Sequence, residues 1–137
     1  MNKFADPSWG PDEQAVWAVV SDLYAAYLDG DRPRLEAHLS AECTFWDPDT
    51  AELLTKTDLQ RKRAQAPAGP AGRPDPLELA TSAAAVRVFG DTAVESHVLR
   101  AIFEDSAHNE ELRCSSVLRR EGDGRWRFVH HHEERRP

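Results

Sequence analysis

Four β-like runs joined by short connections fill the second half of the chain, and this succession constrains the fold more than any other feature. Gly90-Asp91 and the "GDG" at residues 122–124 have the composition of tight turns. Strands joined by such turns pair antiparallel. The runs are residues 77–90, 92–105, 111–121 and 125–133, with a polar loop at 105–110. This half of the chain therefore predicts an antiparallel sheet.

The first half has helical periodicity instead. Apolar residues recur at helical spacing after Pro11 and before Gly30, which predicts a long first helix. Asp31 has the side chain of an N-cap and predicts the start of a short second helix. The apolar stripe of the first helix comprises Val16, Trp17, Val20, Leu23, Tyr24, Tyr27 and Leu28.

A strand and a third helix complete this half. Residues 43–47 are β-like and end at Pro48, which cannot donate to a β-ladder. Thr57 stands three residues before Gln60, the spacing of a capping box, and predicts a short helix there. Residues 66–76 are rich in Pro, Gly and Ala and predict a loop. The pattern as a whole predicts an α+β fold, with three N-terminal helices on one face of a curved antiparallel sheet.

Composition argues against several function classes. The 137 residues suffice for a single domain, 1–137, with residues 1–10 as an N-terminal tail. A formal net charge of −7 disfavours nucleic acid and anionic membrane surfaces as partners. No apolar run reaches the roughly 20 residues of a membrane-spanning helix. The start has no apolar signal segment, which predicts a cytoplasmic protein. Cys43 and Cys114 are expected to be reduced, buried thiols.

The order of these elements, together with three motifs, resembles the nuclear transport factor 2-like superfamily and, within it, the SnoaL-like group. The motifs are the "DGD" between the first two helices, the "FWDP" strand end and the closing "WRFVHHH" strand. The resemblance implies a cone-shaped curved sheet closed by helices, often dimeric through the sheet. Relatives include isomerases, polyketide cyclases, dehydratases and non-enzymatic association domains, so the fold alone does not decide the function.

Asp47 is the first candidate for proton transfer. A carboxylate buried beside Phe45 and Trp46 would have a raised pKa and could move protons near neutrality. The resemblance adds that ketosteroid isomerases carry their general base on an Asp-Pro at the corresponding strand end, where Asp47 and Pro48 stand here. The alternative is that Asp47 only begins a turn.

Aromatic residues are the candidates for lining a cavity. The isomerases of the superfamily place a tyrosine on the first helix, and the matching position here is Leu23, flanked by Tyr24 and Tyr27. Either tyrosine hydroxyl could reach a cavity, or both rings could fill the core with their hydroxyls at its rim. Trp46 and Phe128 would line the same cavity and favour a hydrophobic ligand.

The histidine triplet near the C-terminus is the candidate for a second acid/base group. Because side chains alternate along a strand, His130 and His132 are expected on one face with Trp126 and Phe128, and His131 on the other. Such a pair could bracket a substrate or, with a third ligand, bind a metal. No zinc-type spacing such as HExxH is present, and we expect no metal and no cofactor. The alternative is that these histidines have a structural role near a solvent-exposed strand end.

His97 and Arg113 lie within the long strands. His97 shares a face with Glu95 and Leu99, and this face could line a cavity or an interface. An inward His97 would be a good acid/base partner for Asp47. Arg113 could pair with a substrate carboxylate in bidentate fashion, or it could be a charge on the sheet surface.

These residues favour a small-molecule enzyme. Asp47, His97 and His132 would transfer protons without a cofactor, in an isomerisation, cyclisation or dehydration. The alternative is a non-catalytic ligand-binding or association domain, and the resemblance implies a homodimer through the sheet in either case. A small hydrophobic substrate or ligand would be bound by Tyr24, Tyr27, Trp46, Arg113, Phe128 and His130.

Overall fold

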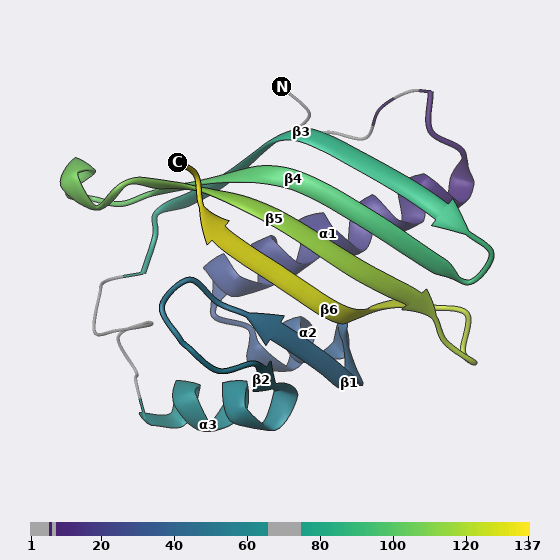
Figure 1. Ribbon diagram of the computed structural model, residues 1–137, viewed down its shortest axis with the longest axis horizontal. Coiled ribbons are helices and arrows are strands. Elements are labelled where there is room, and N and C mark those ends of the chain that lie inside the picture. Colours follow the sequence, from purple (N-terminus) through teal and green to yellow (C-terminus); the bar gives the residue numbers. More distant parts are fainter. Residues whose placement is uncertain (1–5, 7, 66–74) are drawn as a thin grey trace.

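One curved sheet with a long helix packed behind it forms the body of the protein (Figure 1). The structure is a computed structural model and describes residue 6, residues 8–65 and residues 75–137. Its elements are α1 (Pro11–Asp29), α2 (Arg32–Ala37), β1 (Leu39–Trp46), β2 (Leu54–Thr55), α3 (Lys56–Gln65), β3 (Glu78–Phe89), β4 (Thr92–Ile102), a 3-10 turn η2 (Ser106–His108), β5 (Glu110–Arg120) and β6 (Trp126–Arg135). The predicted α+β fold with N-terminal helices is confirmed.

The sheet has the strand order β2-β1-β6-β5-β4-β3 and does not close on itself. Strands β3 to β6 pair antiparallel, as their turns predict. β1 pairs antiparallel with β2 but parallel with β6, so segments far apart in the sequence lie side by side. α1 covers one face of the sheet, and the opposite face is turned toward the viewer in Figure 1.

The core lies between α1 and the sheet. α1 begins with Pro11 in its first turn and ends at Gly30, whose φ of 67° suits a residue without Cβ. The helix buries Val16, Trp17, Val20 and Tyr24, whereas Leu23 and Tyr27 are half-buried and Leu28 is exposed. The predicted stripe is therefore narrower at its C-terminal end than its spacing suggests.

The short helices begin where a side chain caps them. The Asp31 carboxylate accepts from the backbone N–H of Arg34, which confirms Asp31 as the cap of α2. The predicted capping box of α3 at Thr57 is wrong, because Thr55 and Asp58 make the reciprocal hydrogen bonds instead. Thr55 precedes the first helical residue, and its hydroxyl accepts from the backbone N–H of Asp58 at 3.2 Å.

A β-bulge in β6 sets which histidines face the core. Leu118 of β5 pairs with Phe128, but the preceding residue, Val117, pairs with His130, so Val129 is an extra residue in the strand. One added residue reverses the facing of every side chain that follows.

The histidine prediction is wrong for this reason. His131 and Glu133 lie on the core side with Trp126, whereas His130 and His132 lie on the outer face of the sheet. Simple alternation from Phe128 onward gives the opposite assignment.

Some predictions fall partly or wholly outside the described residues. Residues 66–74 of the predicted Pro/Gly-rich loop, and residues 1–5 and 7 of the predicted tail, lie outside them. Within the described part of the chain, no helix is long and apolar enough to cross a membrane. Cys43 and Cys114 are free and buried, as predicted.

Candidate functional site

A chain of three buried, hydrogen-bonded side chains links α1 to β4. The Tyr24 hydroxyl lies 2.6 Å from His97 Nε2, and His97 Nδ1 is hydrogen-bonded to the Glu95 carboxylate. Glu95 and His97 are two residues apart in β4, so both point to the core side. Glu95 is fully buried and His97 is 3% exposed. The sequence left the facing of His97 open, and the structure places it inside.

Aromatic rings surround the three hydrogen-bonded side chains. The Trp17 indole stands edge-on to the His97 ring at 5.8 Å between centroids, and the Tyr24 ring does so at 5.5 Å. Two buried polar atoms nearby, Trp17 Nε1 and Glu95 Oε1, have no hydrogen-bond partner among the described residues. An indole donor and a carboxylate acceptor are thus held unsatisfied in a largely apolar interior, which is costly.

A second polar cluster lies beside the first, on β5 and β6. The His131 imidazole is held between Ser116, whose Oγ lies 2.6 Å from Nδ1, and Glu133, whose carboxylate lies 2.9 Å from Nε2. The Cys114 thiol lies 3.9 Å from the Tyr24 hydroxyl and connects the two clusters. Ser116, His131 and Cys114 are buried, whereas the side chain of Glu133 is one-quarter exposed.

Burial and charge set the protonation of these groups. Burial raises the pKa of Tyr24 well above its usual value and, with the charge of Glu133, also raises the pKa of Cys114, so both stay neutral. Burial alone would neutralise His131 and Glu133, but their mutual hydrogen bond and attraction outweigh it. The pKa of His131 is raised and that of Glu133 is lowered, which favours an ion pair.

Asp47 follows Trp46, the last residue of β1, and is half-buried. Its Oδ1 accepts from the backbone N–H of Asp49 at 2.8 Å, the geometry of a turn that starts with an aspartate. Burial raises the pKa of Asp47, and the charge of Glu133 raises it further. The two alternatives that the sequence leaves open for Asp47, a turn residue and a carboxyl with a raised pKa, are therefore both present.

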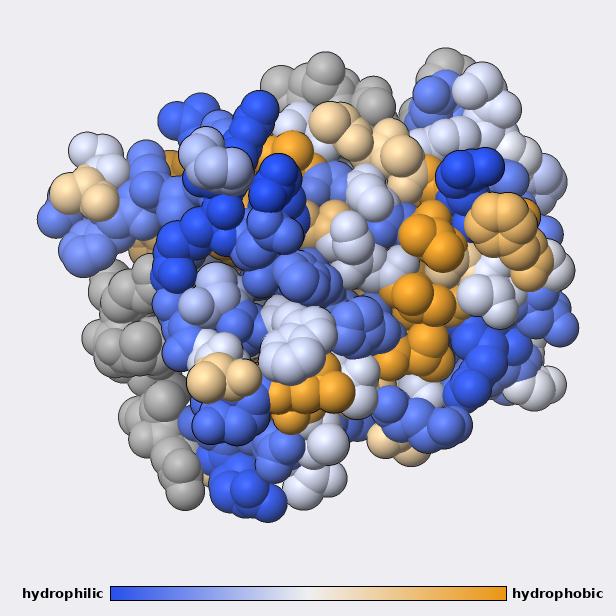
Figure 2. Space-filling view, viewed as in Figure 1, coloured by the Kyte–Doolittle hydropathy of each residue, from blue (hydrophilic) through white to orange (hydrophobic). Residues whose placement is uncertain are grey.

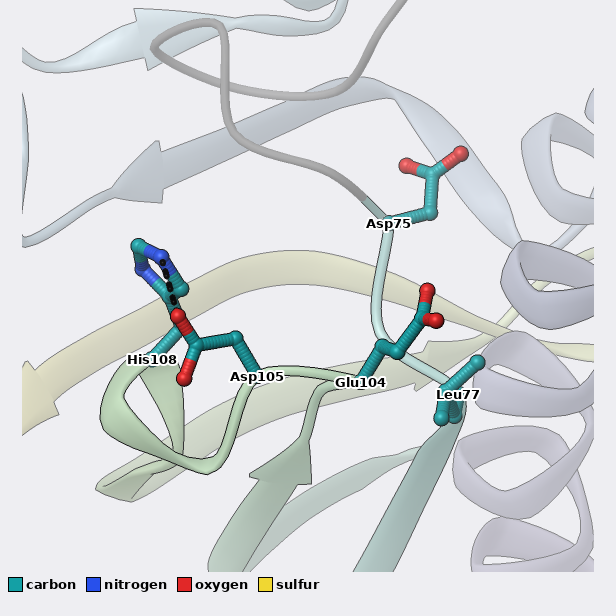
Figure 3. Close-up of a pocket in the computed structure, with 5 residues that line it drawn as sticks. All are labelled: Asp75, Leu77, Glu104, Asp105 and His108. Carbon is teal, nitrogen blue, oxygen red and sulfur yellow. Dashed lines mark ion pairs between the residues drawn. The ribbon is translucent and has the colours of Figure 1, made fainter.

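Two hollows among the described residues lie away from the Tyr24–His97–Glu95 network. One lies at an end of the sheet, where Asp105 and His108 form an ion pair (Figure 3), and it is lined by Asp75, Leu77, Glu104, Asp105 and His108. A second lies on the outer face of the sheet and is lined by Ser115, Ser116, Val117, His130, His132 and Glu134. Neither is lined by Tyr24, His97 or Asp47.

Comparison with known proteins identifies the family. The sequence profile of the SnoaL-like domain matches residues 16–133, which is most of the chain. The chain belongs to the SnoaL-like family. No curated protein is similar enough in sequence to count as a match.

Several solved structures have a fold similar to that of this SnoaL-like chain. A nuclear transport factor 2-like protein of unknown function from Pseudomonas putida KT2440 is 20% identical with a TM-score of 0.77, over 90% of this chain and 85% of that one. A putative calcium/calmodulin-dependent protein kinase II association domain from Xanthomonas campestris is 16% identical with a TM-score of 0.75, over 100% and 96%. A putative ketosteroid isomerase from Parabacteroides distasonis is 14% identical with a TM-score of 0.73, over 99% and 97%. Identities this low establish the shared fold alone.

Some predicted site residues of this SnoaL-like domain meet in the interior. Tyr24 and His97 are in direct contact. Phe128 is fully buried in the core, and Tyr27 packs against that core while half-buried. Asp47 lies near enough to His131 for its charge to contribute to the raised pKa of that histidine.

The other predicted residues do not join them. Arg113, His130 and His132 lie on the outer face of the sheet: Arg113 pairs with Glu134, and His130 Nδ1 lies 2.8 Å from the Thr44 hydroxyl. Trp46 is 41% exposed at the end of β1. These residues cannot line the interior together with Tyr24 and His97.

The sequence interpretation missed Glu95 and Glu133 as members of the site. Glu95 carries a usable signal, because a carboxylate two residues from a histidine in an otherwise apolar strand face will meet it when that face is buried. Glu133 and His131 carry no such signal, because the bulge at Val129 brings both to the core side.

Proposed function

We propose that this SnoaL-like domain is an acid/base enzyme that isomerises, cyclises or dehydrates a small hydrophobic molecule with its own side chains and without an organic cofactor. The observation that carries the proposal is the buried chain Tyr24–His97–Glu95. Its members come from a helix and a strand that pack together in the fold. Apolar side chains could fill the same core, so its stability does not require these three polar groups.

The hydrogen-bonded series Tyr24–His97–Glu95 has the order of a proton relay. With Glu95 ionised, His97 carries its proton on Nδ1, so Nε2 accepts the hydrogen bond of the Tyr24 hydroxyl. When a substrate gives a proton to the Tyr24 oxygen, the original hydroxyl proton passes to His97, and Glu95 stabilises the imidazolium. The reverse transfer returns a proton to the product. This is the division of roles found in carboxylate–imidazole–hydroxyl triads.

Asp47 is the proposed partner of the relay. Its pKa is raised mainly by burial, so at neutral pH it is a stronger base than an exposed carboxylate. The charge of Glu133 raises the pKa of Asp47 and also that of Tyr24. One group would remove a proton from the substrate while the other returns one to a different atom.

The test uses 5-nitrobenzisoxazole, whose ring opening needs only a base in an apolar environment. We expect the wild-type protein to accelerate the opening above the buffer rate, and Asp47→Asn and His97→Gln to lower that rate by at least about tenfold. His130→Gln, a histidine on the outer face, is the matched control and should leave it unchanged. A rate in Asp47→Asn equal to that of the wild type would refute the role of Asp47, and an equal rate in His97→Gln would refute the relay.

A second candidate function, self-association through the sheet, has its own observation. The outer face exposes Val94 at 40% and Phe89 at 59%, and Figure 2 shows hydrophobic side chains gathered on this face. Association domains are among the proteins of similar fold, by their printed descriptions. A homodimer through this face is compatible with the enzyme, because the proposed relay faces the other side of the sheet.

A further inference from the structure

We propose that Cys114, His131 and Glu133 form a binding site for a divalent transition metal ion of the zinc type. One potential ligand atom from each residue, a sulfur, an imidazole nitrogen and a carboxylate oxygen, lies within 4.8 Å of the other two. Sulfur, imidazole and carboxylate are the donor types that zinc takes from proteins. The three residues come from neighbouring positions of β5 and β6, so the sheet itself holds them together.

The orientation of His131 fits a metal ligand. Its Nδ1 is hydrogen-bonded to Ser116 Oγ at 2.6 Å, and such a second contact fixes the ring and directs the other nitrogen. That nitrogen, Nε2, lies 2.9 Å from a Glu133 oxygen. Two atoms bound to one zinc at about 2.0–2.2 Å in tetrahedral geometry stand about 3.3–3.6 Å apart. The two atoms, 2.9 Å apart, need to separate by about half an ångström.

The charge of the interior also favours a cation. No Lys or Arg is buried among the residues that the structure describes, whereas the Glu95 carboxylate is fully buried. Glu95 Oε1 has no hydrogen-bond partner in that part of the chain, and its charge acts on both Cys114 and His131. The interior described by the structure thus places the negative charge of Glu95 and Glu133 beside no buried Lys or Arg. A divalent ion would offset it and, by binding sulfur, would displace the thiol proton.

Three protein ligands leave a fourth coordination position open, which is the pattern of zinc sites that exchange water or a ligand. None of the three ligands is a group that the proposed proton transfer uses, although Cys114 contacts the Tyr24 hydroxyl. Metal binding is therefore measured without reference to turnover, and either proposal can fail without the other.

The experiment titrates the metal-free full chain with Co²⁺ under reducing conditions and then displaces the cobalt with Zn²⁺. We expect one ion per chain and a near-ultraviolet cobalt–thiolate charge-transfer band, which only a sulfur ligand produces. Cys114→Ser should remove the band and weaken Zn²⁺ binding by more than about tenfold. Glu133→Gln should weaken binding while keeping the band.

The matched control is Cys43→Ser, which alters the other buried cysteine, outside the cluster. This variant should bind cobalt as the wild type does. His130→Ala tests the neighbouring histidine on the outer face and should also leave binding unchanged, whereas His131→Gln should abolish it. Absence of stoichiometric binding in the folded wild type, or a band that survives Cys114→Ser, overturns the proposal. Circular dichroism of each variant establishes that it is folded.

Discussion

The hydrogen bond between Tyr24 and His97 is the contact within the interior network that a single substitution isolates best. Tyr24→Phe keeps the ring in its edge-on contact with His97 but leaves the imidazole nitrogen without the hydroxyl. A buried polar group that loses its partner costs about 1–3 kcal/mol. We therefore expect the free energy of unfolding to fall by that amount in urea titrations.

Ser96→Ala is the control for Tyr24→Phe, because Ser96 lies in the same strand on the outer face and is exposed. It should change the stability by less than about 0.5 kcal/mol. Equal losses in the two variants would mean that the bond to His97 contributes nothing specific.

Ala83 carries backbone strain in β3. Its φ of 54° lies in the left-handed region, which costs a residue with a Cβ about 1–2 kcal/mol. The strand register shifts between Ser82 and Ala85, so the strain belongs to a bulge. Ala83→Gly should raise the free energy of unfolding by about 0.5–1 kcal/mol, because relief of strain exceeds the entropy cost of glycine. Ala85→Gly, in regular strand, should lower it, and thermal unfolding of the two variants checks the difference in sign.

The joint between α1 and α2 is the element whose stability depends most clearly on pH. Asp22 of α1 is hydrogen-bonded to Arg34 of α2 and, at 2.6 Å, to His38. The hydrogen bond from Arg34 and then that from His38 lower the pKa of Asp22 to about 2. The folded state thus binds this proton less readily than the unfolded chain, whose aspartates titrate near pH 3.9.

The contribution of Asp22 to stability is therefore fully present above about pH 4 and is lost as the pH falls toward 2. Because Asp22 is 37% exposed, solvent screening limits the effect to about 1 kcal/mol. Asp22→Asn should lower the stability by that amount at pH 7 and by progressively less in acid. Asp29→Asn removes the more exposed partner of Arg34 and should cost less. A pH-independent loss in Asp22→Asn would contradict the assignment, as urea titrations at several pH values would show.

Elements with strong local signals could be predicted from the sequence, and their relative placement could not. Asp31 caps α2 through its own side chain and Gly30 ends α1 through its own backbone, so the bounds of α1 and α2 follow from local chemistry. Thr55 and Thr57 both precede an acceptor by three residues, and the residue that caps α3 is Thr55, which also pairs with Thr44 of β1.

The candidate site was predictable only where it depends on alternation. Alternation groups His97 with Glu95 and Leu99 on one strand face and helical spacing puts Tyr24 on the apolar stripe, but which way the His97 face points stayed open. The inward position of His131 depends on the bulge at Val129. That bulge forms where β6 pairs with β5 on one edge and with β1 on the other. Alternation within the segment carries no information about those partners.

At the scale of the whole molecule, the outer face of the sheet decides whether the protein self-associates. Val94 is 40% exposed on this face, and Leu28 is 41% exposed on α1, which lies on the other side of the sheet (Figure 1). We expect Val94→Glu to shift a wild-type dimer toward the monomer, because a charge placed in an apolar contact must be desolvated. Leu28→Glu is matched in exposure and should leave the dimer intact. Light scattering coupled to size exclusion measures both, and a monomeric wild type would refute self-association.

The parallel pairing of β1 with β6 also affects when the sheet can fold during translation. Thr44 and His130 touch across the two strands, yet they are separated by 86 residues in the sequence. During translation, β1 therefore emerges from the ribosome long before β6 is synthesised. The edge of β1 that pairs with β6 stays unpaired while β3, β4 and β5 are made. The last strand then enters between β1 and β5 and completes the sheet. Contacts of such long range slow folding, so we expect the nascent chain to acquire protease resistance only after β6 has emerged.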